Sequence, residues 1–90
     1  MNDKSVIQIL DILRNEFPAL RAVALHADTP LLSMGHLDSF AIITLLSALE
    51  RAFKIDFDVD QIQMEQLETA QSLSELCIAA MHQQPAQQLV

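Results

Sequence analysis

The chain has 90 residues, which is enough for one small domain and leaves no room for a second. Twelve acidic residues against five basic ones give a formal net charge of −7, so the chain lacks the clustered Lys and Arg that nucleic acids and anionic membranes attract. Its apolar residues make up 51% of the sequence, only four residues are aromatic, and glycine occurs once, which together favour a helical domain with an aliphatic core.

The first periodic segment predicts a helix over residues 5–17. Apolar residues recur there at helical spacing, at Val6, Ile9, Leu10, Leu13 and Phe17. Ser5 with Gln8 has the pattern of a capping box. Pro18 ends the helix because the residue before a proline avoids the α region.

Residues 18–37 lack a sustained period and predict a long loop. Loops of this length inside a small domain are usually functional or disordered. This one carries many apolar residues, namely Leu20, Val23, Leu25, Leu31, Leu32, Met34 and Leu37. We therefore expect an ordered loop that packs across the helices.

The second helix is predicted to run from Asp38 or Ser39 to Phe53. Its buried face consists of Ile42, Leu45, Leu46, Leu49 and Phe53. Its polar side is a narrow stripe made of Thr44, Ser47, Arg51 and Lys54. Phe40 projects onto this stripe, where a large apolar side chain is unexpected. It either meets a partner protein or packs partly against the long loop.

The rest of the chain predicts an extended loop, a short helix and a closing helix. Residues 54–63 alternate apolar and charged, but a lone strand would have no partner, which favours a loop. A short helix is expected at residues 64–67. Ser72 and Glu75 form a capping-box pattern for a last helix whose apolar face is Leu73, Leu76, Cys77 and Ala80. The domain is then residues 1–83, and residues 84–90, rich in Gln, form a flexible tail.

No residue group predicts a metal site. Asp56, Asp58 and Asp60 alternate like the start of a calcium loop, but Gln61 and Leu67 stand where that loop needs Gly and Glu. Cys77 is the single cysteine, so it can form neither an intramolecular disulfide nor a zinc cluster. Its place on an apolar helix face predicts an inert, buried thiol.

The most informative segment is residues 34–40 (MGHLDSF), where the only glycine precedes a helix that opens with serine. A helix N-terminus offers unpaired N–H groups and a positive dipole end, which favour a phosphodiester on Ser39. The alternative is that Asp38 or Ser39 is simply an N-cap. A hydrolase built on His36 and Ser39 would also need an orienting acid and an oxyanion hole. Asp38 is close in sequence, but three neighbouring residues at a helix start rarely converge into such a site.

Residues 5–82 resemble the acyl carrier protein and peptidyl carrier protein family. Its Gly-x-x-Asp-Ser-Leu-like motif corresponds to Gly35-His36-Leu37-Asp38-Ser39-Phe40, and the similarity continues through residues 49–53, 55–57 and 68–73. The resemblance implies an all-α, four-helix carrier bundle with three longer helices and one short third helix. It also implies a non-catalytic protein whose Ser39 receives 4′-phosphopantetheine from coenzyme A, through a phosphopantetheinyl transferase.

In such carriers an acyl or aminoacyl group is held as a thioester on the arm and moves from a loading ligase or transferase to downstream biosynthetic enzymes. The resemblance gives Asp38 a role in transferase recognition or as the helix cap. We expect a soluble, cytoplasmic monomer. The rival hypothesis is a helical interaction module without a prosthetic group.

The second helix departs from the carriers of fatty acid synthesis, which are rich in Glu and Asp on this helix. The residues expected to face partners are instead Phe40, Ala41, Ile43, Thr44, Ser47 and Arg51. The Asp-Ser-Phe version of the motif resembles stand-alone carriers of specialised pathways, including D-alanyl and aminoacyl carriers. A dedicated set of partner enzymes is therefore expected.

Overall fold

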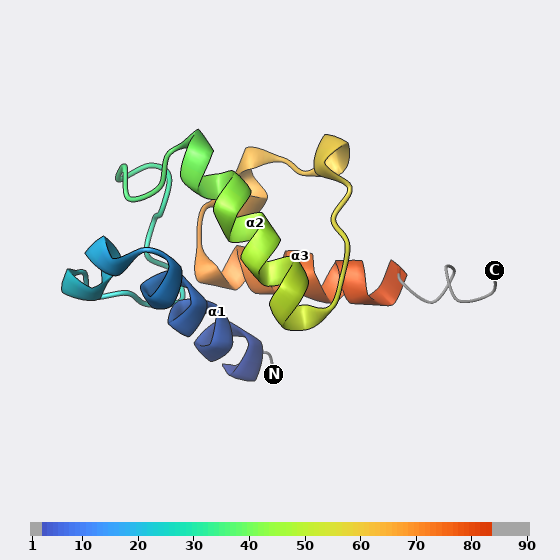
Figure 1. Ribbon diagram of the computed structural model, residues 1–90, viewed down its shortest axis with the longest axis horizontal. Coiled ribbons are helices and arrows are strands. Elements are labelled where there is room, and N and C mark those ends of the chain that lie inside the picture. The colour runs from blue at the N-terminus through green and yellow to red at the C-terminus, as the bar shows by residue number, and fades with distance from the viewer. Residues whose placement is uncertain (1–2, 84–90) are drawn as a thin grey trace.

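The computed structural model describes residues 3–83, and its elements are all helical (Figure 1). Three α-helices, α1 (Asp3–Glu16), α2 (Ser39–Phe53) and α3 (Ala70–Gln83), are joined by 3-10 helices η1 (Pro18–Ala22), η2 (Val59–Gln61) and η3 (Met64–Leu67). No strand occurs between residues 3 and 83. The predicted all-α architecture and the short helix at residues 64–67 are confirmed. The predicted tail at residues 84–90 lies outside the described residues.

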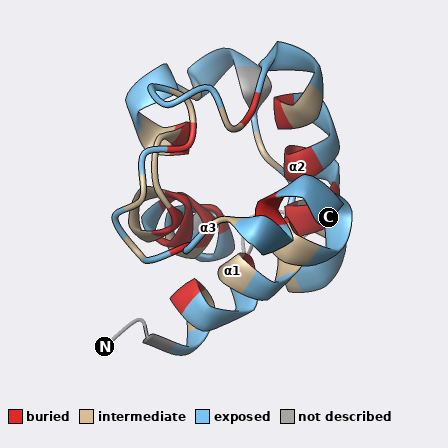
Figure 2. Cartoon of the chain, turned by 90° about the vertical axis from the view of Figure 1, so that its left-hand side faces the viewer, coloured by how far each residue is buried: buried red, intermediate tan, exposed pale blue. Residues whose placement is uncertain are grey.

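The core lies where the three α-helices meet, since each of them contacts the other two. Figure 2 marks the buried residues in red, and they occur on all three α-helices and in the segments that join them. Among the largest fully buried side chains are Ile9, Leu13, Leu45, Leu49 and Leu73. Burying an aliphatic side chain of this size contributes about 1.5–3 kcal/mol, so the periodic apolar faces account for the helix arrangement. Phe53, expected in this core, is half-buried.

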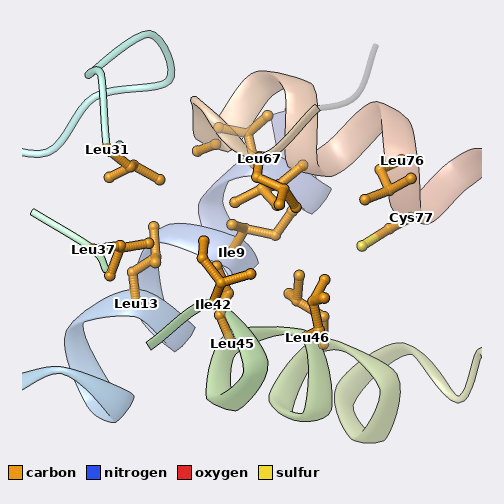
Figure 3. Packing of buried hydrophobic residues seen from close by; sticks show 14 of the residues in the cluster. Ile9, Leu13, Leu31, Leu37, Ile42, Leu45, Leu46, Leu67, Leu76 and Cys77 are labelled. Atoms are coloured by element: carbon orange, nitrogen blue, oxygen red, sulfur yellow. The ribbon is translucent and has the colours of Figure 1, made fainter. Parts of the chain in front are cut away.

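The long loop between α1 and α2 is ordered and belongs to the core. Leu20, Leu25, Leu31 and Leu37 are all buried, as expected. Leu31 and Leu37 point from the loop into the space between the helices (Figure 3). The loop also contains η1, which the sequence did not predict and which begins at a proline, a residue suited to the first position of a helix.

Met34 was expected to pack with the other loop residues, and this prediction is wrong. Its side chain is 66% exposed. The amide of Gly35 donates a hydrogen bond to the carbonyl oxygen of Leu32 at 3.0 Å, and Gly35 has φ +78°, so the chain reverses here. Met34 lies inside this turn segment, which carries its side chain outward while Leu31 and Leu37 on either side turn inward.

Two predicted capping boxes are also wrong. α1 already includes Asp3, so Ser5 lies within the helix instead of at its start. α3 begins at Ala70, where Thr69 and Ser72 exchange hydrogen bonds: Ser72 N–H donates to Thr69 Oγ1 at 3.0 Å, and Thr69 N–H donates to Ser72 Oγ at 3.1 Å. A hydroxyl at the third helical position replaces the expected Glu or Gln in this reciprocal pair.

Lys54 is the C-cap of α2; it adopts the left-handed conformation with φ 57° and ψ 51° and donates its N–H to the carbonyl of Glu50. A side chain costs about 1–2 kcal/mol in this region, whereas glycine enters it freely. We therefore expect Lys54→Gly to stabilise the fold by about 0.5–1 kcal/mol, after allowing for the greater freedom of glycine in the unfolded chain. Urea unfolding followed by circular dichroism measures this change.

The matched control is Lys54→Ala, which removes the same charge but keeps Cβ. It should give no such gain. If alanine stabilises the protein as much as glycine does, the effect comes from the lost charge and not from the backbone conformation.

Candidate functional site

Ser39 is the first residue of α2 and is exposed. The long loop leads directly into this end of the helix (Figure 1). Within residues 3–83, no hydrogen bond involves the Ser39 hydroxyl. The hydroxyl is therefore open to a second protein, at the positive end of the helix dipole.

Asp38 is the N-cap of α2. Its backbone is extended, with φ −103° and ψ −179°, and its Oδ1 accepts a hydrogen bond from the Ala41 N–H at 2.8 Å. The carboxylate thus satisfies one of the amides that a helix start leaves without an intrahelical partner. Because Asp38 caps the helix, the neighbouring Ser39 hydroxyl is not needed as the capping acceptor.

Removing this cap should cost stability. We expect Asp38→Ala to lower the free energy of unfolding by about 1 kcal/mol, because the Ala41 N–H loses its side-chain acceptor. Asp38→Asn keeps an acceptor oxygen in the same place and should lose clearly less. Urea unfolding of the two variants measures the difference, and equal losses would show that the charge, not the hydrogen bond, stabilises the helix start.

The residues predicted to face partners lie along one side of α2. Phe40 is 81% exposed and Ile43 is 63% exposed, while Thr44, Ser47 and Arg51 are also exposed and Ala41 is half-buried. The alternative that Phe40 packs against the loop is therefore wrong. Residues three or four apart share a helix face, so Phe40 and Ile43 form one apolar surface next to Ser39. Arg51, farther along, lies 3.9 Å from the Glu16 carboxylate of α1.

A shallow groove between the loop before α2 and η3 was not predicted. It has a volume of about 540 Å³ and is lined by Leu32, Ser33, Met64, Glu65 and Glu68. Met64 is 61% exposed. The groove joins the loop before α2 to η3, two segments far apart in the sequence, so no local pattern could have indicated it.

The other groups singled out in the sequence form no second site. His36 is half-buried, and within the described part of the chain it shares no hydrogen bond with Ser39. Residues 3–83 contain no cluster of three or more His, Cys, Asp or Glu side chains able to hold a metal ion. Cys77 is fully buried, and burial raises the pKa of its thiol from 9.0 to about 12, so the thiol is neutral at ordinary pH.

The geometry at Ser39 fits a covalently attached phosphodiester arm. The hydroxyl is exposed, it has no hydrogen-bond partner within residues 3–83, and it lies at a helix N-terminus, where negative charge is favoured. Such an arm, when attached, supplies a thiol that holds an acyl group as a thioester. No helix among the described residues is long and apolar enough to cross a membrane.

The family model for the phosphopantetheine attachment site matches residues 8–77. Comparison with the curated proteins gives no match. The matched range covers most of the chain, from α1 through the loop and α2 into α3, so it decides against an interaction module without a prosthetic group. The chain therefore belongs to the phosphopantetheine-binding carrier family, whose members are non-catalytic, carry 4′-phosphopantetheine and receive it from a phosphopantetheinyl transferase.

Proposed function

We propose that Ser39 is the residue that carries 4′-phosphopantetheine. The observation that supports this most strongly is its free, exposed hydroxyl at the start of α2, within the family match. The other serines are less suitable because they are hydrogen-bonded, partly or fully buried, or in the middle of a helix: Ser5, Ser33, Ser47, Ser72 and Ser74. Ser39 alone among them combines exposure with a helix N-terminus.

The chain supplies the nucleophile and holds it in place, and the transferase supplies the base that activates it. A serine hydroxyl needs a base to become nucleophilic, and no base is hydrogen-bonded to Ser39 among the described residues. Ser39 Oγ forms a bond to phosphorus as the pyrophosphate bond of coenzyme A breaks, the nucleotide leaves, and the hydroxyl proton passes to a base of the transferase. The hydrogen bond from Ala41 N–H to Asp38 keeps the helix start, and with it Ser39, in place.

A promiscuous phosphopantetheinyl transferase with coenzyme A tests this proposal. Intact-protein mass spectrometry should show the wild-type chain gaining the mass of a single arm. Fragmentation of the loaded protein should place that mass on Ser39 and not on Ser33, six residues earlier. No mass gain under conditions that load a control carrier would contradict the proposal.

We further propose that the cargo is an acyl or aminoacyl group of a specialised pathway, loaded by a dedicated ligase or transferase. The exposed Phe40 and Ile43 support this, together with the absence of acidic residues from the first turn of α2. A partner that recognises this face needs an apolar surface. Although the chain carries a net charge of −7, the first turn of α2 offers a strongly basic partner no acidic residue to pair with.

Enzymes of general fatty acid synthesis should therefore use the loaded protein poorly. We expect turnover at least about tenfold below that of a conventional acidic carrier at low salt. Acidic residues in the first turn of α2 that would speed the encounter with a basic enzyme are missing, and such steering typically raises association rates by about tenfold or more. The double variant Thr44→Glu, Ser47→Glu places acids on the exposed face of α2 and should recover part of the rate. Equal turnover of the wild-type protein and the acidic carrier would rule this specialisation out.

A further inference from the structure

The part of the loop nearest Ser39, residues 31–37, is hydrogen-bonded to Glu68 at the corner between η3 and α3. The backbone N–H of Ser33 donates to Glu68 Oε1 at 3.2 Å, and the Ser33 hydroxyl donates to Oε2 at 2.5 Å. The Leu31 N–H donates to the backbone carbonyl of Glu68 at 2.7 Å. Glu68 thus accepts three hydrogen bonds from a short stretch that lies far from it in the sequence.

Segment 31–37 connects the residues held by Glu68 to Ser39. The Leu37 N–H donates to the Leu31 carbonyl at 3.1 Å, which closes the segment into a loop, and both of these leucines are buried. Leu37 is followed directly by the cap Asp38 and then by Ser39. The exposed tip of the segment, residues 33–35, has no buried side chain. Its own turn is closed by the Gly35 N–H, and the Glu68 carboxylate holds it to the rest of the molecule.

Glu68 is itself held on a rigid part of the molecule. The residues near it, Leu67 and Ala70, are 3% and 1% exposed and belong to the core. The exposed tip is therefore tied, through the two carboxylate oxygens of a half-buried residue, to a corner whose neighbouring residues are buried in the core.

From these contacts we propose that Glu68 is a positioning residue for the loading of Ser39. This proposal rests on the proposed function of Ser39. The Glu68 carboxylate keeps segment 31–37 in the one conformation that a transferase binds together with the start of α2. Without it the tip samples other conformations, and the fraction of molecules ready to bind falls.

The predicted effect is on binding and not on the chemical step. When only a fraction of a protein is competent to bind, the apparent affinity falls by that fraction, while the bound complex reacts as before. Glu68→Ala should therefore raise the KM of the transferase for this carrier by about five- to tenfold, if the competent fraction drops to about a tenth or a fifth, and leave kcat nearly unchanged.

Glu65→Ala is the matched control. Glu65 is an exposed acid on η3, it lines the same groove, and its removal changes the net charge equally. Among the described residues its side chain makes no hydrogen bond to segment 31–37. The KM of the transferase for Glu65→Ala should stay within about twofold of the wild-type value, since Glu68 still holds segment 31–37. An equal rise in both variants would reveal a charge effect on the transferase and overturn the proposal.

Ser33→Ala examines the same contact from the other side and avoids any change at the α3 corner. It removes the hydroxyl donor but keeps the backbone one, so its KM should rise less than that of Glu68→Ala. The double variant should be no worse than Glu68→Ala, because both changes break one interaction. If Glu68→Ala does not fold, a KM for Ser33→Ala equal to wild type overturns the proposal.

Amide hydrogen exchange supplies the second readout. The Ser33 amide should exchange faster in Glu68→Ala, while amides in the middle of α2 keep their protection. Faster exchange at Ser33 with an unchanged KM would mean that loading does not depend on the order of this segment, which overturns the proposal. Failure of the wild-type protein to load at all would instead contradict the assignment of Ser39.

Discussion

Ser39→Ala is expected to fold normally and to gain no mass when incubated with a phosphopantetheinyl transferase and coenzyme A. On the proposed assignment, the substitution removes the atom that forms the new bond to phosphorus, so the loss should be complete and not partial. Ser39 is exposed, and its hydroxyl makes no hydrogen bond within residues 3–83, so stability should change by less than about 0.5 kcal/mol. Circular dichroism and intact-protein mass spectrometry on the same sample separate the two effects.

Ser47→Ala is the natural control for this loss. Ser47 is also exposed and lies on the same helix, but it is away from the N-terminus of α2. It should load to completion. A mass gain that persists in Ser39→Ala would move the attachment site to another residue.

Leu31→Ala is expected to cost about 2–5 kcal/mol of stability, as much as a leucine in the middle of a helix. Leu31 lies in a loop, yet it is only 1% exposed and joins the same apolar cluster as α1, α2 and α3. Domains of this size are commonly stable by only about 5–15 kcal/mol, so the variant should unfold at a much lower urea concentration. Far-ultraviolet circular dichroism during urea unfolding measures the shift.

The neighbouring Leu32→Ala provides the comparison. Leu32 is half-buried, so the same truncation removes fewer contacts and should cost clearly less. Similar losses for the two variants would show that the loop is not packed into the core as tightly as its burial indicates.

The helices were predictable because their stability depends on a local pattern. Apolar residues at helical spacing placed α1 and α2 to within a few residues, and the leucines of the loop indicated that it would be ordered. The turn at Gly35 was harder to foresee, because a chain reversal decides which side of a loop faces water. Met34 is exposed for that reason, although its apolar side chain suggested burial.

The candidate site was predictable only in part. An Asp-Ser pair at a helix start usually indicates an N-cap, and Asp38 is indeed the cap. The carrier function follows from the match over residues 8–77, which no single short motif could replace. The hydrogen bonds between Ser33 and Glu68 join residues 35 positions apart, and no periodic pattern in a sequence encodes such a contact.

The burial of Cys77 has a consequence for the thioester chemistry of a carrier. A thioester can be transferred to any accessible thiolate, but Cys77 is fully buried, and burial raises the pKa of its thiol to about 12, so the thiol is neutral at ordinary pH. The folded chain therefore offers no competing nucleophilic sulfur of its own onto which an acyl group could migrate. Chemoselective labelling of the native protein with a thiol reagent should accordingly report the terminal sulfur of the arm against a silent background.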